Sequence, residues 1–80
     1  MHDQTTIEEI VNELFRKAPN LIPRKMLSDI TGGSLSVKYL ANLDSEGIGI
    51  KPRVRVGGKV AYPKDAAIAW LRNRCRVEGV

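Results

Sequence analysis

The residues best suited to do chemistry lie in a short basic segment in the second half of the chain, RVRVGGKVAYP (residues 53–63). Its cations are Arg53, Arg55 and Lys59, separated by valines and by a pair of glycines. Guanidinium and ammonium groups donate hydrogen bonds to phosphate and carboxylate oxygens. Cations that recur along one short segment therefore predict an anionic partner.

The charge of the whole chain is concentrated around this segment. The net charge is +4, yet residues 1–21 are net negative. Residues 51–76 contain one acid, Asp65, and eight basic residues: Lys51, Arg53, Arg55, Lys59, Lys64, Arg72, Arg74 and Arg76. Such a distribution favours a polyanion or an acidic protein surface as the partner, although a solvated basic tail would carry the same charge.

Catalytic and metal chemistry have little support in the sequence. A single cysteine, Cys75, excludes an internal disulfide and a cysteine-based zinc site. The one histidine is His2, and no Cys–His pair or carboxylate dyad has catalytic spacing. The VGGK segment lacks the spacing of a phosphate-binding P-loop. We therefore expect no catalytic residue, no cofactor, no metal and no small-molecule substrate.

The sequence also favours a cytoplasmic protein without membrane contact. No apolar run approaches the length of about 18 residues that a transmembrane helix needs. No segment resembles the apolar region of a signal peptide. A lone cysteine is compatible with a reducing compartment.

Hydrophobic periodicity predicts four helices around the basic segment. The first covers residues 6–17 and ends before Pro19, and the second runs from Pro23 to Ile30 and stops at a glycine pair. The third is capped by Ser34 or Ser36 and continues to about Ser45. The fourth covers residues 64–75 and has basic residues in its last turns. Eighty residues allow one domain, residues 1–80.

The third helix is expected to have a polar outer side. Val37, Leu40 and Leu43 recur at helical spacing and should face the core. Ser36 precedes the helix, and Lys38, Tyr39 and Asn42 are then left together on the outer side.

The basic segment is expected to form a β-hairpin, for which two registers can be written. A two-residue loop at Gly57–Gly58 would pair Arg55 with Val60, and both faces would then mix polar and apolar side chains. A three-residue loop, residues 56–58, would pair Arg55 with Lys59 instead. A slip of one residue exchanges the faces, so the side-chain pattern should decide the register.

We expect the three-residue loop because it sorts the side chains. It directs Val54, Val60 and Tyr62 to the core and Arg53, Arg55, Lys59 and Ala61 outward. It also places Gly58 at the position that requires a left-handed conformation. Arg55 opposite Lys59 is a like-charge pair, which solvent would tolerate and a phosphate strand would stabilise.

This order of elements, two short helices joined by a glycine turn and followed by a basic hairpin, is typical of a helix-turn-helix with a wing. The second helix of such a pair enters the major groove, where Asn42 can pair with adenine and Lys38 can reach guanine or a phosphate. The basic hairpin would contact the phosphate backbone. The expected DNA-binding residues are Ser36, Lys38, Tyr39 and Asn42 on the helix and Lys51, Arg53, Arg55 and Lys59 on the wing.

The segments LIPRKMLSDITGGSLSVKYLANL and VRVGGKVAYPKDAAIAWLRNR resemble the winged helix-turn-helix of excisionase-like and MerR-like DNA-binding proteins. The resemblance covers about residues 21–74, and its Gly32–Gly33–Ser34 turn is one residue longer than is usual in the family. It implies that the chain binds duplex DNA, as an excision factor of a phage or mobile element or as a small transcriptional regulator. By this resemblance too, Lys38, Tyr39 and Asn42 fall on the recognition helix.

The sequence therefore predicts a single winged helix-turn-helix domain, mainly α with a small β-hairpin, that binds double-stranded DNA sequence-specifically. Few phosphate contacts are available, so specificity would need a second copy or a partner protein such as an integrase. The apolar side of helix 6–17 could form a homodimer surface. The alternative is a protein-interaction module whose wing binds an acidic partner without DNA. Single-stranded nucleic acid is disfavoured because the four aromatic residues form no evident stacking platform.

Overall fold

The computed structural model describes residues 3–76 and 78 of the chain. Four helices and three strands lie within these residues, and the strands form one antiparallel sheet in the order β1–β3–β2. Their bounds are α1 Asp3–Leu14, β1 Leu21–Pro23, α2 Arg24–Ile30, α3 Val37–Glu46, β2 Val54–Val56, β3 Lys59–Pro63 and α4 Lys64–Arg74. None of the described helices is both long enough and apolar enough to cross a bilayer.

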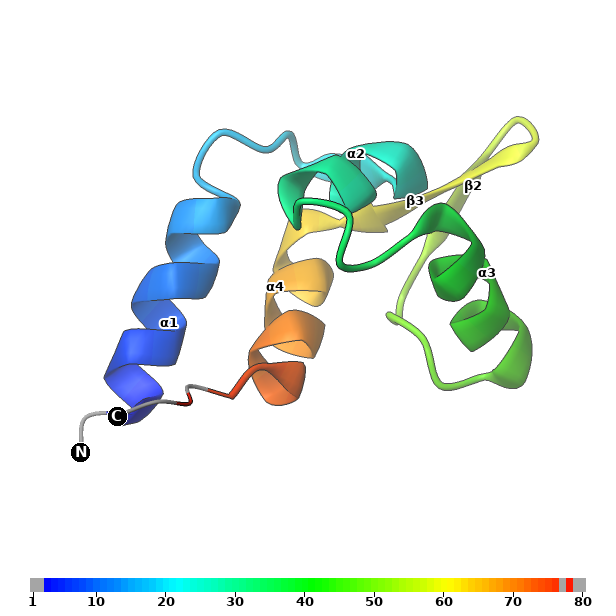
Figure 1. Ribbon diagram of the computed structural model, residues 1–80. Coiled ribbons are helices and arrows are strands. Elements are labelled where there is room, and N and C mark those ends of the chain that lie inside the picture. Colours follow the sequence, from blue (N-terminus) through cyan, green and yellow to red (C-terminus); the bar gives the residue numbers. More distant parts are fainter. Residues whose placement is uncertain (1–2, 77, 79–80) are drawn as a thin grey trace.

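The elements form two groups around a common core (Figure 1). Helices α1 and α4 pack side by side, and an ion pair between Glu8 and Arg72 joins them at 3.7 Å. Helix α3 and the β2–β3 hairpin lie on the other side of the molecule from α1, and the tip of the hairpin projects beyond α2. The hairpin tip and one side of α3 are thereby left open to solvent.

The core draws apolar side chains from every element except β2. Its largest fully buried members are Tyr62, Phe15, Ile22, Leu27, Leu40, Ile50 and Val11. The expected inward positions Leu40 and Leu43 are buried, whereas Val37 is exposed, contrary to expectation. Val37 is the first residue of α3, and this end of the helix extends past the core and borders an open hollow.

Helix α1 begins and ends three residues earlier than expected. Beyond Leu14 the chain tightens into turns, in which the N–H of Arg16 donates to the carbonyl of Glu13 and that of Ala18 to the carbonyl of Phe15. Pro19, which follows directly, cannot continue a helix. Of the apolar residues expected in this helix, Phe15, which directly follows α1, is fully buried, but Leu14 remains exposed.

Strand β1 has no counterpart among the predicted elements. Ile22 lies opposite Tyr62 in β3, so the sheet has three strands where a hairpin alone was expected. Three residues are too few to show an alternating pattern in sequence. Pro23, which lacks a backbone N–H, closes the strand and serves as the N-cap position of α2. The described residues therefore form a mixed α/β structure, with more strand than the sequence suggested.

The predicted hairpin register is wrong. The structure pairs Arg55 with Val60 and Val56 with Lys59, so the loop has two residues. Gly57 has a φ of 61°, whereas Gly58 does not have a positive φ. This combination is typical of a type II′ turn, whose twist matches that of the two strands. The geometry of the turn decides the register here. Both faces of the hairpin are exposed near its tip, so separating polar from apolar side chains would gain little there.

The register changes which side chains share a face. Arg55 lies on the same face as Val60, whereas Lys59 lies on the opposite face, so the expected like-charge pair does not form. Ala61, expected to point outward, is buried, and Val54, expected in the core, is exposed. The cations of the hairpin therefore surround it and do not form one row.

Substituting either loop glycine should distinguish the two registers. Gly57→Ala should lower the free energy of unfolding by about 1 kcal/mol, because an L-residue is strained at positive φ. Gly58→Ala should have a much smaller effect, since an added Cβ would meet no atom within 4 Å. Urea denaturation of both variants measures the difference. The reverse order of stabilities would favour the three-residue loop.

Candidate nucleic-acid interface

The turn between α2 and α3 is built by glycines and closed by a serine cap. Gly32 and Gly33 both have positive φ, and their N–H groups donate to the carbonyls of Asp29 and Ser28, which is the Schellman pattern. The Ser36 hydroxyl accepts a hydrogen bond from the N–H of Tyr39 at 3.0 Å. Of the two caps left open by the sequence, Ser36 therefore starts α3.

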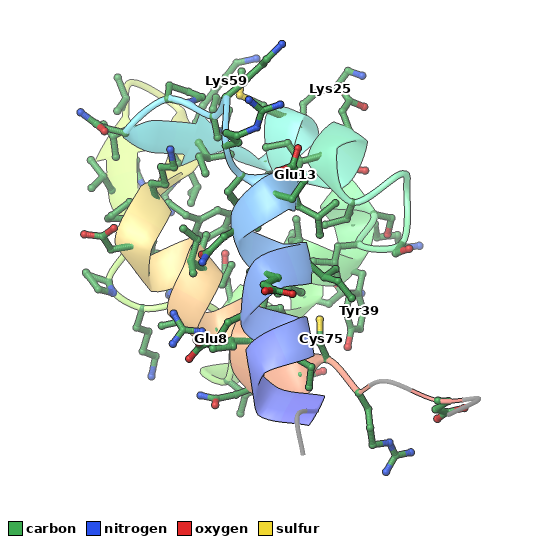
Figure 2. The ribbon with its side chains drawn as sticks, turned by 90° about the vertical axis from the view of Figure 1, so that its left-hand side faces the viewer. Glu8, Glu13, Lys25, Tyr39, Lys59 and Cys75 are labelled. Atoms are coloured by element: carbon green, nitrogen blue, oxygen red, sulfur yellow. The ribbon has the colours of Figure 1, made fainter. Side chains whose placement is uncertain are left out.

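The four residues predicted for the recognition helix are all exposed, but they do not share one surface. Lys38 and Asn42 are four residues apart and project from the same side of α3. Tyr39 is turned toward a different hollow, where it lies with Trp70 and Cys75. Figure 2 shows Tyr39 and Cys75 on the same side of the molecule. The outer side of α3 is thus formed by Lys38 and Asn42, with Ser36 at its start.

A hollow of about 330 Å³ brings the start of α2, the start of α3 and the hairpin tip together. We call it the basic hollow, and its lining is Pro23, Arg24, Lys25, Val37, Gly58, Lys59 and Val60. Figure 2 shows Lys25 and Lys59 on the same upper side of the molecule. Two cations from elements far apart in sequence are thereby placed at one surface.

Lys25 was not among the predicted site residues. Its ammonium group lies 3.7 Å from the Asp29 carboxylate, but both side chains are mostly exposed, so this pair contributes little and leaves Lys25 available. The sequence did show a basic residue directly after the start of a short helix, which could have suggested Lys25. The prediction relied instead on the higher density of basic residues in 51–76.

Beneath this surface, the buried carboxylate of Asp44 joins three elements. Its Oδ2 accepts hydrogen bonds from Arg24 Nη2 and from the Tyr62 hydroxyl, each at 2.7 Å. Arg24 Nε also donates to the Tyr62 oxygen at 3.0 Å. These three residues are the centre of what we call the Asp44 network, and they connect α2, α3 and β3. Nothing in the sequence distinguished Asp44 from a solvated acid.

The network changes the proton affinity of two of its members. The hydrogen bond to Asp44 raises the pKa of the Arg24 guanidinium, and partial burial opposes this effect. Burial raises the pKa of the Tyr62 hydroxyl, and the hydrogen bond that it donates to Asp44 adds to the increase. Arg24 therefore remains a fixed cation whose donors point inward, although it lines the basic hollow.

Arg53 is the fourth member of the Asp44 network and is therefore not a free cation. Its Nη1 lies 3.8 Å from Asp44 Oδ1, and its Nη2 donates to the Asp44 carbonyl at 3.5 Å. The chain passes close to the same carboxylate at Gly49, where any Cβ would overlap Asp44 Oδ1. Arg53 therefore connects the base of the hairpin to α3.

The other predicted wing residues remain open to solvent. Lys51 lies in the segment between α3 and β2, and Arg55 and Lys59 lie in the hairpin. Within the described part of the chain, these three cations have no ion-pair partner at 4.0 Å or less. His2 lies outside the described residues, among which no group of three or more His, Cys, Asp or Glu side chains could hold a metal ion.

Tyr62→Phe should destabilise the protein and change its response to alkaline pH. The loss of the hydroxyl should cost about 1–3 kcal/mol at neutral pH, because the buried Asp44 loses a donor. The raised pKa of Tyr62 means that the unfolded state loses this proton first, so stability declines as the pH rises above about 10.

Denaturant titrations at pH 7 to 11 test both effects, with Tyr39→Phe as the control because its ring is exposed. The decline should be smaller in Tyr62→Phe than in Tyr39→Phe. Equal pH profiles would contradict the assignment.

Arg53 and Arg55 should differ in what their removal does. Arg53→Ala should lower the free energy of unfolding by about 1 kcal/mol or more, because Asp44 is left with fewer compensating partners. Arg55→Ala should change the free energy of unfolding by less than about 0.5 kcal/mol. Arg55 is exposed and does not contact Asp44, and substitutions of such surface residues are usually close to neutral. Thermal denaturation of the two variants provides the comparison, and equal effects would show that Arg53 does not support α3.

Comparison of the chain with protein-family models, curated protein sequences and solved structures found no match. The functional assignment therefore depends on the arrangement of the residues described above.

Proposed function

We propose that this chain binds double-stranded DNA as a winged helix-turn-helix domain formed by α2, α3 and the β2–β3 hairpin. In this arrangement α3 enters the major groove, and the hairpin is the wing. The observation that carries the proposal is the basic hollow, in which the starts of both helices and the tip of the hairpin adjoin. A surface that is to follow one face of a duplex needs these three parts to be close together.

Base recognition is assigned to the exposed side of α3. Asn42 has an amide that can form the bidentate contact with adenine, and Lys38 can reach guanine or a neighbouring phosphate. Ser36 lies at the N-terminal end of the helix, which in this type of domain is close to the base edges. Tyr39 is directed to the other hollow and is not assigned to base contacts.

Phosphate binding is assigned to the exposed cations on and beside the hairpin that lie outside the Asp44 network. These are Lys51, Arg55 and Lys59, together with Lys25 from the start of α2. Each phosphate that a cation neutralises releases counterions, which sets the salt dependence of the affinity. With so few contacts, one copy should bind DNA weakly and with a shallow salt dependence.

The biological role proposed for this domain is that of a cytoplasmic transcriptional regulator or an accessory factor in DNA excision. Weak binding by one copy would be supplemented by a second copy on an adjacent site or by a partner protein such as an integrase. The alternative function is binding of an acidic protein by the same basic surface. A chain with that function alone would show no affinity for duplex DNA even at low salt.

Titration of a fluorescently labelled duplex over a range of salt concentrations tests the proposal. The logarithm of the affinity should fall linearly with the logarithm of salt concentration, and Lys25→Ala and Lys59→Ala should each reduce the slope by about 0.9. Arg76→Ala removes the same charge from an exposed residue beyond α4 and should leave the slope unchanged. Absence of binding at low salt by a folded protein would contradict the proposal.

Selection of duplexes from a random pool tests the assignment of α3. Asn42→Ala should relax the preference at one base pair, with a loss of about 1–3 kcal/mol for the preferred duplex. Ser45→Ala, at an exposed position farther along α3, serves as the control. An unchanged preference in Asn42→Ala would exclude Asn42 from base recognition.

A further inference from the structure

A second hollow, larger than the basic hollow and sharing no residue with it, lies between α1, α3 and the end of α4. Its volume is about 590 Å³. We call it the apolar groove, and the lining residues that matter here are Leu14, Leu35, Tyr39, Trp70, Arg74 and Cys75. Its lining is mainly apolar, and Arg74 is the charged residue at its margin. An apolar concavity with a cationic margin favours an apolar segment that carries acidic residues.

Helix α1 of this same chain has that composition. Val11 and Phe15 are fully buried in the core, but Ile10 is 49% exposed and Leu14 is 39% exposed. These two residues are four apart and form a second apolar strip on the helix surface. Glu13, three residues after Ile10, borders the strip, and its only described ion pair, with Arg16, is highly exposed and contributes little. The strip thus combines exposed apolar area with an available carboxylate.

From this complementarity we infer that the apolar groove receives the α1 strip of a second copy of the chain, in a two-fold symmetric dimer. In such a dimer one surface patch serves both copies, so groove and strip must be continuous on each molecule. Leu14 meets this requirement because it belongs to the strip and also lines the groove. Ile10 enters the partner's groove, and Glu13 faces the partner's Arg74.

Arg74 is prepared for this contact. Its guanidinium carbon lies 4.5 Å from the centre of the Trp70 ring, and its Nη2 donates to the carbonyl of Ile48 at 3.5 Å. The stacked position holds the cation at the margin of the groove while leaving it exposed to a carboxylate. The groove shares no residue with the basic hollow, so the dimer would leave Lys25 and Lys59 uncovered, and the inference does not depend on DNA binding.

Sedimentation equilibrium of the full chain without DNA tests the inference. The wild-type protein should show a monomer–dimer equilibrium. Ile10→Lys should weaken it by about a hundredfold, because a symmetric interface contains each substitution twice. The control is Val56→Lys, which changes an apolar residue of similar exposure at the hairpin tip and should leave the equilibrium unchanged.

A charge exchange makes the test specific for the predicted contact. Glu13→Arg alone and Arg74→Glu alone should each weaken dimerisation by about tenfold, because each places like charges opposite one another. An equimolar mixture of the two variants should dimerise again, since both contacts of the mixed dimer then join opposite charges. Circular dichroism confirms that each variant is folded.

Three results would overturn the inference. These are a monomer at all concentrations up to millimolar, a dimer that Ile10→Lys leaves unchanged, and a mixture that fails to recover. Duplex binding by a protein that remains monomeric would overturn the dimer and leave the proposed DNA-binding function intact. A dimer that does not bind duplex DNA would support the dimer and contradict the proposed DNA-binding function.

Discussion

The buried carboxylate of Asp44 is the interaction on which the placement of the other elements depends. A charge removed from water is costly unless hydrogen bonds and opposite charge compensate it, and here Arg24, Tyr62 and Arg53 provide them. These partners come from α2, β3 and the base of the hairpin. Their contacts with Asp44 therefore fix the position of each of these three parts relative to α3. A domain of this size buries too little surface to tolerate the loss of such a network.

The network also divides the arginines and lysines into two kinds. Arg24 and Arg53 compensate Asp44, whereas Lys25, Arg55 and Lys59 have no comparable internal role. Net charge counts both kinds alike, although the first kind supports the fold and only the second is free to attract a partner. The surface available to an anion is therefore smaller than the composition suggests. It includes Lys25, a residue outside the most basic part of the chain.

The sequence predicted the helices better than the strands, although α1 begins and ends three residues earlier than expected. The glycine pair after α2, the apolar spacing around Leu40 and the basic residues in the last turns of α4 placed these three helices within one or two residues of their observed bounds. Strand β1 and the hairpin register were missed, because three-residue strands are decided by pairing and by turn geometry at Gly57. Asp44 and Lys25 depend on neighbours far along the chain, which no local pattern reveals.

Helix α3 forms part of both hollows, since Val37 lines one and Tyr39 lines the other. Val37 and Tyr39 are two residues apart on one ten-residue helix, so a single element joins the walls of the two hollows. If an occupant of one hollow bound better to one position of α3, it would change the affinity of the other hollow for its own occupant. The second occupant would then change the affinity for the first by the same factor. The single shared wall therefore provides a physical route for thermodynamic linkage between the two surfaces.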